Sequence, residues 1–305
     1  MALTNFPNGV SSFGMPLIGM TTGSIFFVHH TGSNGNSGTD RDNPFSTIDY
    51  AIGQCTNNKG DIIFVMPGHT EAITGASEIN LDVAGVSLIG LGSGLDMPQV
   101  DYTHASGEVS ISAANVTIQN MNFHANITDV LIGIEVAAAG DNFTIRGCRF
   151  DVEAANTDEF VSSIDIVAGA NFGLIEDCFF DMAVGGAVAA IHLNGACTDL
   201  TILRNNIKGD YSTACITGST TLSTNIDIGY NVMLNGIGSD IGEEPCIELV
   251  TASDGTIYNN YCGCNLATKA AAIVSTKSLL FENYYNEDVS GAGTGGIIGT
   301  ASGND

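Results

Sequence analysis

The sequence predicts a single right-handed parallel β-helix, an all-β solenoid in which each coil of the chain stacks on the one before. Two observations support this prediction. A short motif, apolar-x-x-(Asn, Cys or Met)-x-apolar, recurs at intervals of roughly 23 to 30 residues, and repeats of this length are typical of stacked units that cannot bury their apolar face alone. Between copies lies a second strand with alternating apolar and polar residues, as expected of a strand with one buried face.

The motif can be followed through most of the chain. Its copies begin at Ile118, Ile145, Ile175, Ile202, Ile228, Ile257 and Leu280. Leu88 begins an earlier, degenerate copy. Helical repeats would need apolar residues at i, i+3 and i+4, and leucine-rich repeats need an L-x-x-L-x-L frame, so both classes are excluded.

The fourth position of the motif predicts an internal ladder at one turn. Parallel strands place equivalent residues about 4.8 Å apart, so these side chains should form one column. Its members are Cys148, Cys178, Asn205, Asn231, Asn260 and Asn283. An inward Asn at a corner satisfies backbone groups of the turn, and we therefore interpret the column as structural.

Composition excludes several classes of function. Eight Lys plus Arg against 33 Asp plus Glu give a formal charge of −25, which disfavours binding to nucleic acid or to anionic membranes. No apolar run is long enough for a transmembrane helix, and residues 1–20 lack the features of a signal peptide. We expect folding in the reducing cytoplasm of a host, cysteines present as thiols, and neither a metal site nor a cofactor.

The ends of the chain predict further segments. Residues 1–39 carry no charged side chain and predict an extended N-terminal arm, which could dock on another surface or fold onto the protein's own β-helix. Its anchoring residues would be Phe6, Phe13, Leu17, Ile18, Phe26 and Phe27. Residues 40–60 predict a capping loop and a short helix with Ser46 as N-cap. Residues 61–300 are expected to form the β-helix and residues 301–305 a tail.

Two resemblances add to these expectations. The strings NPFSTI at residues 43–48 and GDIIFVMPG at residues 60–68 resemble the opening of pectate-lyase-like β-helix proteins, and the motif extends this likeness over residues 40–300. The first residues, MALTNFPNGVSSFG, resemble the N-termini of tailed-phage virion proteins. The second resemblance implies a protein that attaches to a particle through its N-terminal segment.

If the chain is an enzyme, its catalytic residues are expected on the outward face of the second strand. Glu135, Asp165 and His192 occupy this position on successive coils. Glu135 and Asp165 would then lie about 5 Å apart, the carboxyl spacing of retaining glycosidases, with His192 beside Asp165. The chain has no Trp and few aromatic residues on this face, which argues against a sugar-processing cleft.

A second outward column follows the motif and is expected to be an exposed corner of mixed charge. It comprises His124, Asp151, Asp181 and Lys208. A polysaccharide lyase of the pectate-lyase-like fold would be implied to use Ca²⁺ held by carboxylates and an Arg or Lys as base. Arg146 and Arg149 lie close to Asp151 and Glu153 in the sequence.

The expected function is that of a non-enzymatic structural protein of a phage particle, a capsid decoration or a head or tail appendage anchored by its N-terminal arm. The expected partners are other virion proteins, the major capsid protein among them, and further copies in a homotrimer. The expected location is the virion. The alternative is a tailspike-like protein that binds or depolymerises a host glycan with Glu135, Asp165 and His192.

Overall fold

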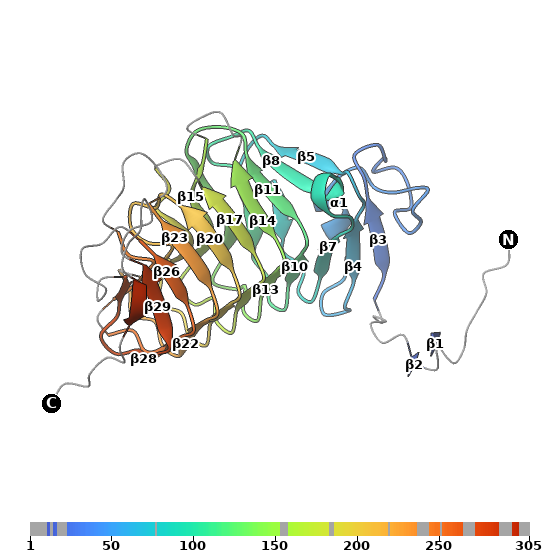
Figure 1. Cartoon of the computed structure of the whole chain (residues 1–305). Coiled ribbons are helices and arrows are strands. Elements are labelled where there is room, and N and C mark those ends of the chain that lie inside the picture. Colours follow the sequence, from blue (N-terminus) through green and yellow to red (C-terminus); the bar gives the residue numbers. More distant parts are fainter. Residues whose placement is uncertain are drawn as a thin grey trace.

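The computed structural model describes residues 23–76, 78–152, 158–182, 186–218, 220–236, 244–250, 252–264 and 272–285, and the backbone alone of residues 11–12, 15–16, 286 and 295–298. Figure 1 shows the described parts as an elongated solenoid, with α1 (Ile48–Ile52) at the N-terminal end. Three long sheets of parallel strands run along its axis. The predicted fold class, a parallel β-helix, is therefore confirmed.

Sheet I and sheet II meet at a tight turn. Sheet I contains β3 (Ile25–Val28), β4 (Ile62–Val65), β7 (Ser87–Gly90), β10 (Thr117–Gln119), β13 (Thr144–Arg146), β16 (Leu174–Glu176), β19 (Thr201–Leu203), β22 (Ile226–Gly229), β25 (Gly255–Tyr258) and β28 (Leu279–Phe281). Sheet II contains β5 (Thr70–Ile73), β8 (Gln99–Tyr102), β11 (Asn122–Ala125), β14 (Arg149–Val152), β17 (Phe179–Met182), β20 (Asn206–Gly209), β23 (Val232–Asn235), β26 (Tyr261–Gly263), β29 (Asn283–Asn286) and β30 (Gly295–Ile298).

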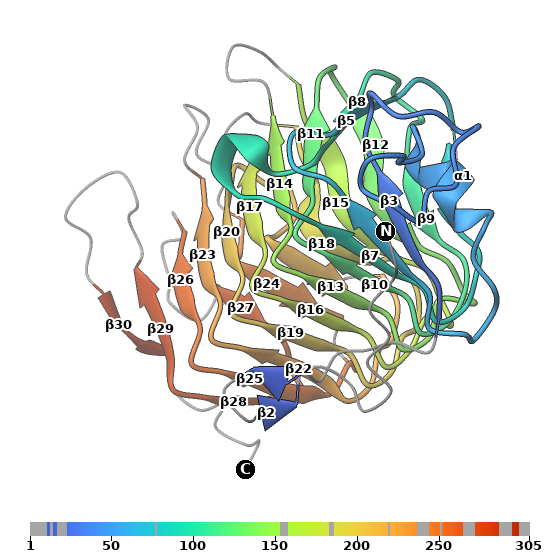
Figure 2. The same cartoon turned by 90° about the vertical axis from the view of Figure 1, so that its right-hand side faces the viewer.

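Sheet III closes each coil. It contains β6 (Ile79–Leu81), β9 (Val109–Ile111), β12 (Val130–Val136), β15 (Phe160–Ile166), β18 (Ala189–Leu193), β21 (Ile216–Gly218), β24 (Ile247–Leu249) and β27 (Ile273–Val274). The other elements are β1 (Ser11–Ser12), β2 (Met15–Pro16) and the 3₁₀-helix Gly94–Asp96. At the end remote from α1, β30 pairs antiparallel with β29, as Figure 2 shows.

The repeat motif sets the register of the coils. Ile118 pairs with Leu88 on one side and with Ile145 on the other, and all three side chains are buried. On sheet II, Phe150 stacks on Phe180 with ring centroids 4.7 Å apart. The interior is thus filled by columns of apolar side chains, whose removal from water is the main driving force for folding.

The tight turn between sheets I and II holds a buried column of ladder residues. Asn231 Oδ1 accepts the backbone N–H of Asn205 at 2.9 Å, and Asn231 Nδ2 donates to the carbonyl of Ile202 and to Oδ1 of Asn260, both at 3.0 Å. The N–H of Cys178 donates to Asn205 Oδ1 at 3.0 Å. The column comprises Cys148, Cys178, Asn205, Asn231, Asn260 and Asn283.

The residue before the fourth motif position has a left-handed backbone in each copy from Ile118 onward. These residues, with φ between 52° and 59°, are Asn120, Gly147, Asp177, Arg204, Tyr230, Asn259 and Glu282. This conformation costs a non-glycine residue roughly 1–2 kcal/mol. The sharp reversal between two short strands requires it all the same, and residue type alone does not reveal it because only three of these residues are Asn or Gly.

The solenoid begins before the boundary predicted at residue 61. β3 pairs in parallel with β4 along its whole length, so Phe26 and Phe27 belong to the first strand of sheet I rather than to an extended arm. Phe26 is 8% exposed and packs against Phe45, with ring centroids 5.7 Å apart. The absence of charged side chains from residues 1–39 suggested an arm. The backbone N–H and C=O groups of the apolar residues 25–28, however, find hydrogen-bond partners by pairing in the sheet. The other predicted anchoring residues, Phe6, Phe13, Leu17 and Ile18, and the tail at 301–305 lie outside the described residues.

The helix α1 covers the open end of the first coils. It packs against β3, β4 and β6. Its N-cap is Thr47 rather than the predicted Ser46, because the N–H and the hydroxyl of Ser46 both donate to Asn34 Oδ1, at 3.0 and 2.9 Å. The N–H of Ile48 instead donates to Glu71 Oε2 at 2.9 Å. Within the described residues, no helix has the length and apolar character needed to cross a membrane.

Candidate active site on sheet III

One polar side chain per coil lines the outer face of sheet III. Strand register places these residues side by side, and we call them the sheet III strip: Asn80, Ser110, Glu135, Asp165, His192, Thr217 and Glu248. Their strands lie about 4.8 Å apart. The residues on either side in each strand, such as Ile134 and Val136 around Glu135, point inward and are fully buried. The register therefore brings together the three catalytic residues expected from the sequence.

Asp165 is the most constrained carboxylate of the strip. It is 2% exposed, and it accepts hydrogen bonds from His192 Nδ1 at 2.7 Å and from Asn194 Nδ2 at 3.1 Å. A carboxylate only accepts hydrogen bonds, so Nδ1 of His192 carries the proton and Nε2 is the basic nitrogen. This pairing prepares His192, whose side chain is 19% exposed, to take a proton from a bound molecule.

The role expected for Asp165 changes with this geometry. As the nucleophile of a retaining glycosidase it would have to reach a substrate, but its burial and its two hydrogen bonds direct it toward His192 and Asn194. It is therefore a positioning residue. Asn194 was not identified from the sequence, although it follows His192 by two residues and so lies on the same side of the chain, a spacing that could have revealed it.

Glu135 is half-buried and lies next to Asp165 in the strip. Burial raises the pKa of its carboxyl, and the negative charges of Glu108 and Asp165 raise it further. A raised pKa favours the protonated form of the carboxyl, which is the form that a general acid requires. Burial and the charge of Glu244 raise the pKa of Glu248 in the same way.

Cations are concentrated on the other two sheets. None of the eight described strands of sheet III contains Lys or Arg. Arg146 is on sheet I, Arg149 and Lys208 are on sheet II, and Arg204 is at the turn between them. The arginine or lysine base implied by the lyase resemblance therefore has no counterpart on the described strands of sheet III. Within the described residues, no three His, Cys, Asp or Glu side chains are placed to hold a metal ion.

The second outward column lies on sheet II and forms pairs of opposite charge. His124 Nδ1 lies 2.8 Å from Asp151 Oδ1, Arg149 Nε donates to Asp151 Oδ2 at 2.7 Å, and Lys208 Nζ lies 3.8 Å from Asp181 Oδ1. Burial alone would raise the pKa of Asp151, but the hydrogen bonds and charges of His124 and Arg149 lower it. This column is a charged surface whose members neutralise one another.

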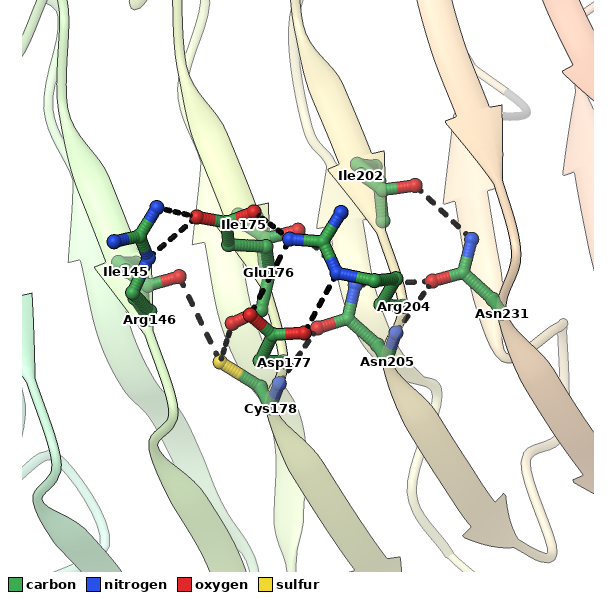
Figure 3. A network of polar contacts seen from close by, with 10 residues as sticks. All are labelled: Ile145, Arg146, Ile175, Glu176, Asp177, Cys178, Ile202, Arg204, Asn205 and Asn231. Atoms are coloured by element: carbon green, nitrogen blue, oxygen red, sulfur yellow. Dashed lines mark hydrogen bonds and ion pairs between the residues drawn. The ribbon is translucent and has the colours of Figure 1, made fainter.

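A third polar cluster, not identified from the sequence, joins successive coils at the edge of sheet I. Glu176, 4% exposed, receives hydrogen bonds from Arg146 on one side and Arg204 on the other, and Arg204 Nε also donates to Asp177 Oδ1 at 2.8 Å (Figure 3). The signal was present, because Arg146 and Glu176 hold equivalent positions of successive motif copies. Each charged group of the cluster is paired with another member. The cluster therefore stabilises three coils and does not face a ligand.

Comparisons with known proteins give distant structural likenesses. No family model and no curated protein matches the chain. Among solved structures it is similar to a rhamnogalacturonan lyase, with a TM-score of 0.47 and 11% identity over 89% of this chain and 65% of that one. It is also similar to the lacto-N-biosidase of Eubacterium ramulus, with a TM-score of 0.37 and 14% identity over 86% and 68% of the two chains. A third likeness is to the tailspike protein of Escherichia coli bacteriophage HK620 in complex with a pentasaccharide, with a TM-score of 0.35 and 15% identity. That match covers 77% of this chain and 52% of the tailspike chain.

Proposed function

We propose that the outer face of sheet III binds an extended polysaccharide and hydrolyses it, with His192 as general base and Glu135 as general acid. The observation that carries the proposal is the buried Asp165 carboxylate, which orients His192 and lies beside a carboxyl of raised pKa. The strip offers one polar group per coil along the solenoid axis, an arrangement that suits a linear polymer better than a compact ligand.

The reaction follows from the positions of the two groups. His192 Nε2 removes a proton from water as the water oxygen bonds to the anomeric carbon. The bond between that carbon and the glycosidic oxygen breaks, and the leaving oxygen takes the proton of Glu135. The backbones of Glu135 and His192 are two strands apart, about 10 Å, which leaves room for a sugar and a water molecule between the groups. Such a separation predicts inversion at the anomeric carbon.

The test is the release of reducing ends from host capsular polysaccharides by the purified protein. Glu135→Gln and His192→Ala should each lower the rate by about a hundredfold or more. Asp181→Asn, a change of the same kind on sheet II, is the control and should leave the rate unchanged. Absence of cleavage on every host glycan, or a first product of retained configuration by NMR, would contradict the mechanism.

A second role, structural and non-enzymatic, is favoured by an exposed apolar patch on sheet II. Val232, Leu234, Tyr261 and Tyr284 are exposed at the outer face of its last coils, and the rings of Tyr261 and Tyr284 stack with centroids 5.0 Å apart. Patches of this kind are typical of protein–protein interfaces. In a chain of charge −25, copies can meet at this patch with the least repulsion, so we propose it as the contact of a homotrimer.

In this role the protein would be a capsid decoration or a head or tail appendage of a virion, bound to other virion proteins through its N-terminal segment. Deleting residues 1–22 should abolish binding to particles while the circular dichroism of the β-helix is retained. Tyr261→Ser should convert the trimer to monomer in sedimentation. Unchanged particle binding by the truncated chain, or a monomeric wild type, would count against the structural role. The structural and hydrolytic roles are compatible in one virion protein.

A further inference from the structure

We propose that the sheet III strip selects uncharged sugar chains and rejects uronate chains, an inference that rests on the proposed function and narrows its substrate class. The strip contains Glu135, Asp165 and Glu248 and no cation. A carboxylated sugar chain laid along it would be repelled by the Asp165 carboxylate and would meet no Lys or Arg on the described strands of this sheet. Such repulsion costs binding free energy unless a cation compensates for it.

Cations of the neighbouring sheets are already engaged elsewhere. Arg146 and Arg204 bond Glu176, Arg149 bonds Asp151, and Lys208 lies beside Asp181. Drawing one of them toward a bound uronate would deprive a buried or partly buried carboxylate of a cationic partner, which carries a desolvation cost. These side chains are therefore not available to compensate for the negative charge of a uronate bound on sheet III.

The remaining groups of the strip suit hydroxyls. Asn80, Ser110 and Thr217 are uncharged donors and acceptors, and carboxyls such as Glu135 and Glu248 accept from sugar hydroxyls or, when protonated, donate to them. Thr217 lies between His192 and Glu248 in register. It is buried, and its Oγ1 has no hydrogen-bond partner among the described residues. Thr217 is as buried as Asp165 and does not reach a ligand, so the partly exposed groups of the strip that meet sugar hydroxyls are Asn80, Glu135 and Glu248.

The dimensions fit a chain rather than a single sugar. From Asn80 to Glu248 the strip crosses seven strands of sheet III, a span of about 29 Å at the spacing of parallel strands. The spacing of the polar groups, one per strand, is comparable with the spacing of sugar rings along a polysaccharide chain. Glu248, which is partly exposed, would then be a binding subsite beyond the reacting residues, and it should affect affinity more than the rate at saturation.

The experiment uses a glycan array and calorimetry with the full chain. The probes are capsular oligosaccharides grouped as uncharged, uronate-containing and amino-containing. The wild type should bind uncharged chains with an affinity that does not change with added salt. Ser110→Arg should raise affinity for uronate chains by about tenfold, as a new charge-assisted hydrogen bond permits. Arg in place of Asp181 on sheet II (Asp181→Arg) is the control and should not.

The outcomes separate this inference from the hydrolytic function. Tighter binding of uronate chains than of uncharged chains by the wild type, or affinity for uncharged chains that falls with salt, overturns the substrate class. Cleavage of a uronate chain overturns it as well while supporting hydrolysis. Binding of uncharged chains without cleavage supports the substrate class and refutes hydrolysis. Retention of no glycan at all overturns both.

Discussion

His192 Nδ1 lies 2.7 Å from Oδ1 of Asp165, across two adjacent coils of sheet III. The two residues are 27 positions apart in the chain, and parallel register alone makes them neighbours. Asp165 is buried, and its second oxygen accepts from Asn194. The pair therefore has a defined orientation before any ligand arrives.

Replacing Asp165 with Asn should remove that orientation. An amide can donate to Nδ1 of His192, which moves the imidazole proton to Nε2 and takes away the basic nitrogen. We expect a loss of about a hundredfold or more in turnover, with little change in stability. The measurement is the initial rate of reducing-end release, with Asp181→Asn as the matched control. Equal rates for the two variants would mean that His192 does not act as the base.

Glu159 should make stability depend on pH near neutrality. Burial, and then Asp129, raise the pKa of this 3% exposed carboxyl from 4.5 to about 7. Because the folded value is the higher one, the contribution to stability is complete below about 4.5 and is lost as pH rises through about 7. Denaturant midpoints of the wild type should therefore fall between about pH 5 and about pH 7 and level off above that.

Glu159→Gln should remove that fall, since Gln mimics the protonated acid. Glu78→Gln is the control: a backbone hydrogen bond from Thr74 lowers the pKa of Glu78, so its carboxyl is ionised throughout the interval. A slope that survives in Glu159→Gln would assign the pH dependence to another group.

Asn231→Ala should be strongly destabilising. Its amide bonds Ile202 and Asn205 on the preceding coil and Asn260 on the following one, and the substitution leaves buried backbone groups without partners. We expect a loss of about 3 kcal/mol in the free energy of unfolding. Asn206→Ala, one position beyond the ladder on the exposed face of sheet II, should change it by no more than about 0.5 kcal/mol. Similar midpoints for both variants in urea would refute the structural role of the ladder.

Phe172→Gly should stabilise the protein. Phe172 has φ of 57° and is 53% exposed, so a bulky residue holds a left-handed backbone with little burial in return. Glycine relieves a strain of about 1 kcal/mol. Phe172→Ala loses the same ring but keeps the Cβ, and should give no gain. Thermal midpoints of the three proteins decide the matter, and an equal gain from Ala would point to the ring rather than the backbone.

The sequence by itself determined the solenoid, its register and the sets of residues that share a column. A period of two along each strand and a repeat near 27 residues are enough to place Asn205 on Asn231 and Asp165 beside His192. In stacked parallel strands, residues that are one repeat apart in the sequence become neighbours in space. Strand β3 was missed because its pairing with β4 depends on where the chain turns, not on its lack of charge.

Only the tertiary structure decided which members of a column are buried and what they bond. Two outward residues of equal rank, Glu135 and Asp165, differ because Asn194 and His192 converge on one of them and not on the other. The pairing of Glu176 with two arginines was likewise decided only by the tertiary structure. So were the left-handed residues of the turns. Side-chain direction and local enclosure depend on contacts from several coils at once, and a periodic pattern records only the position of a residue within its own coil.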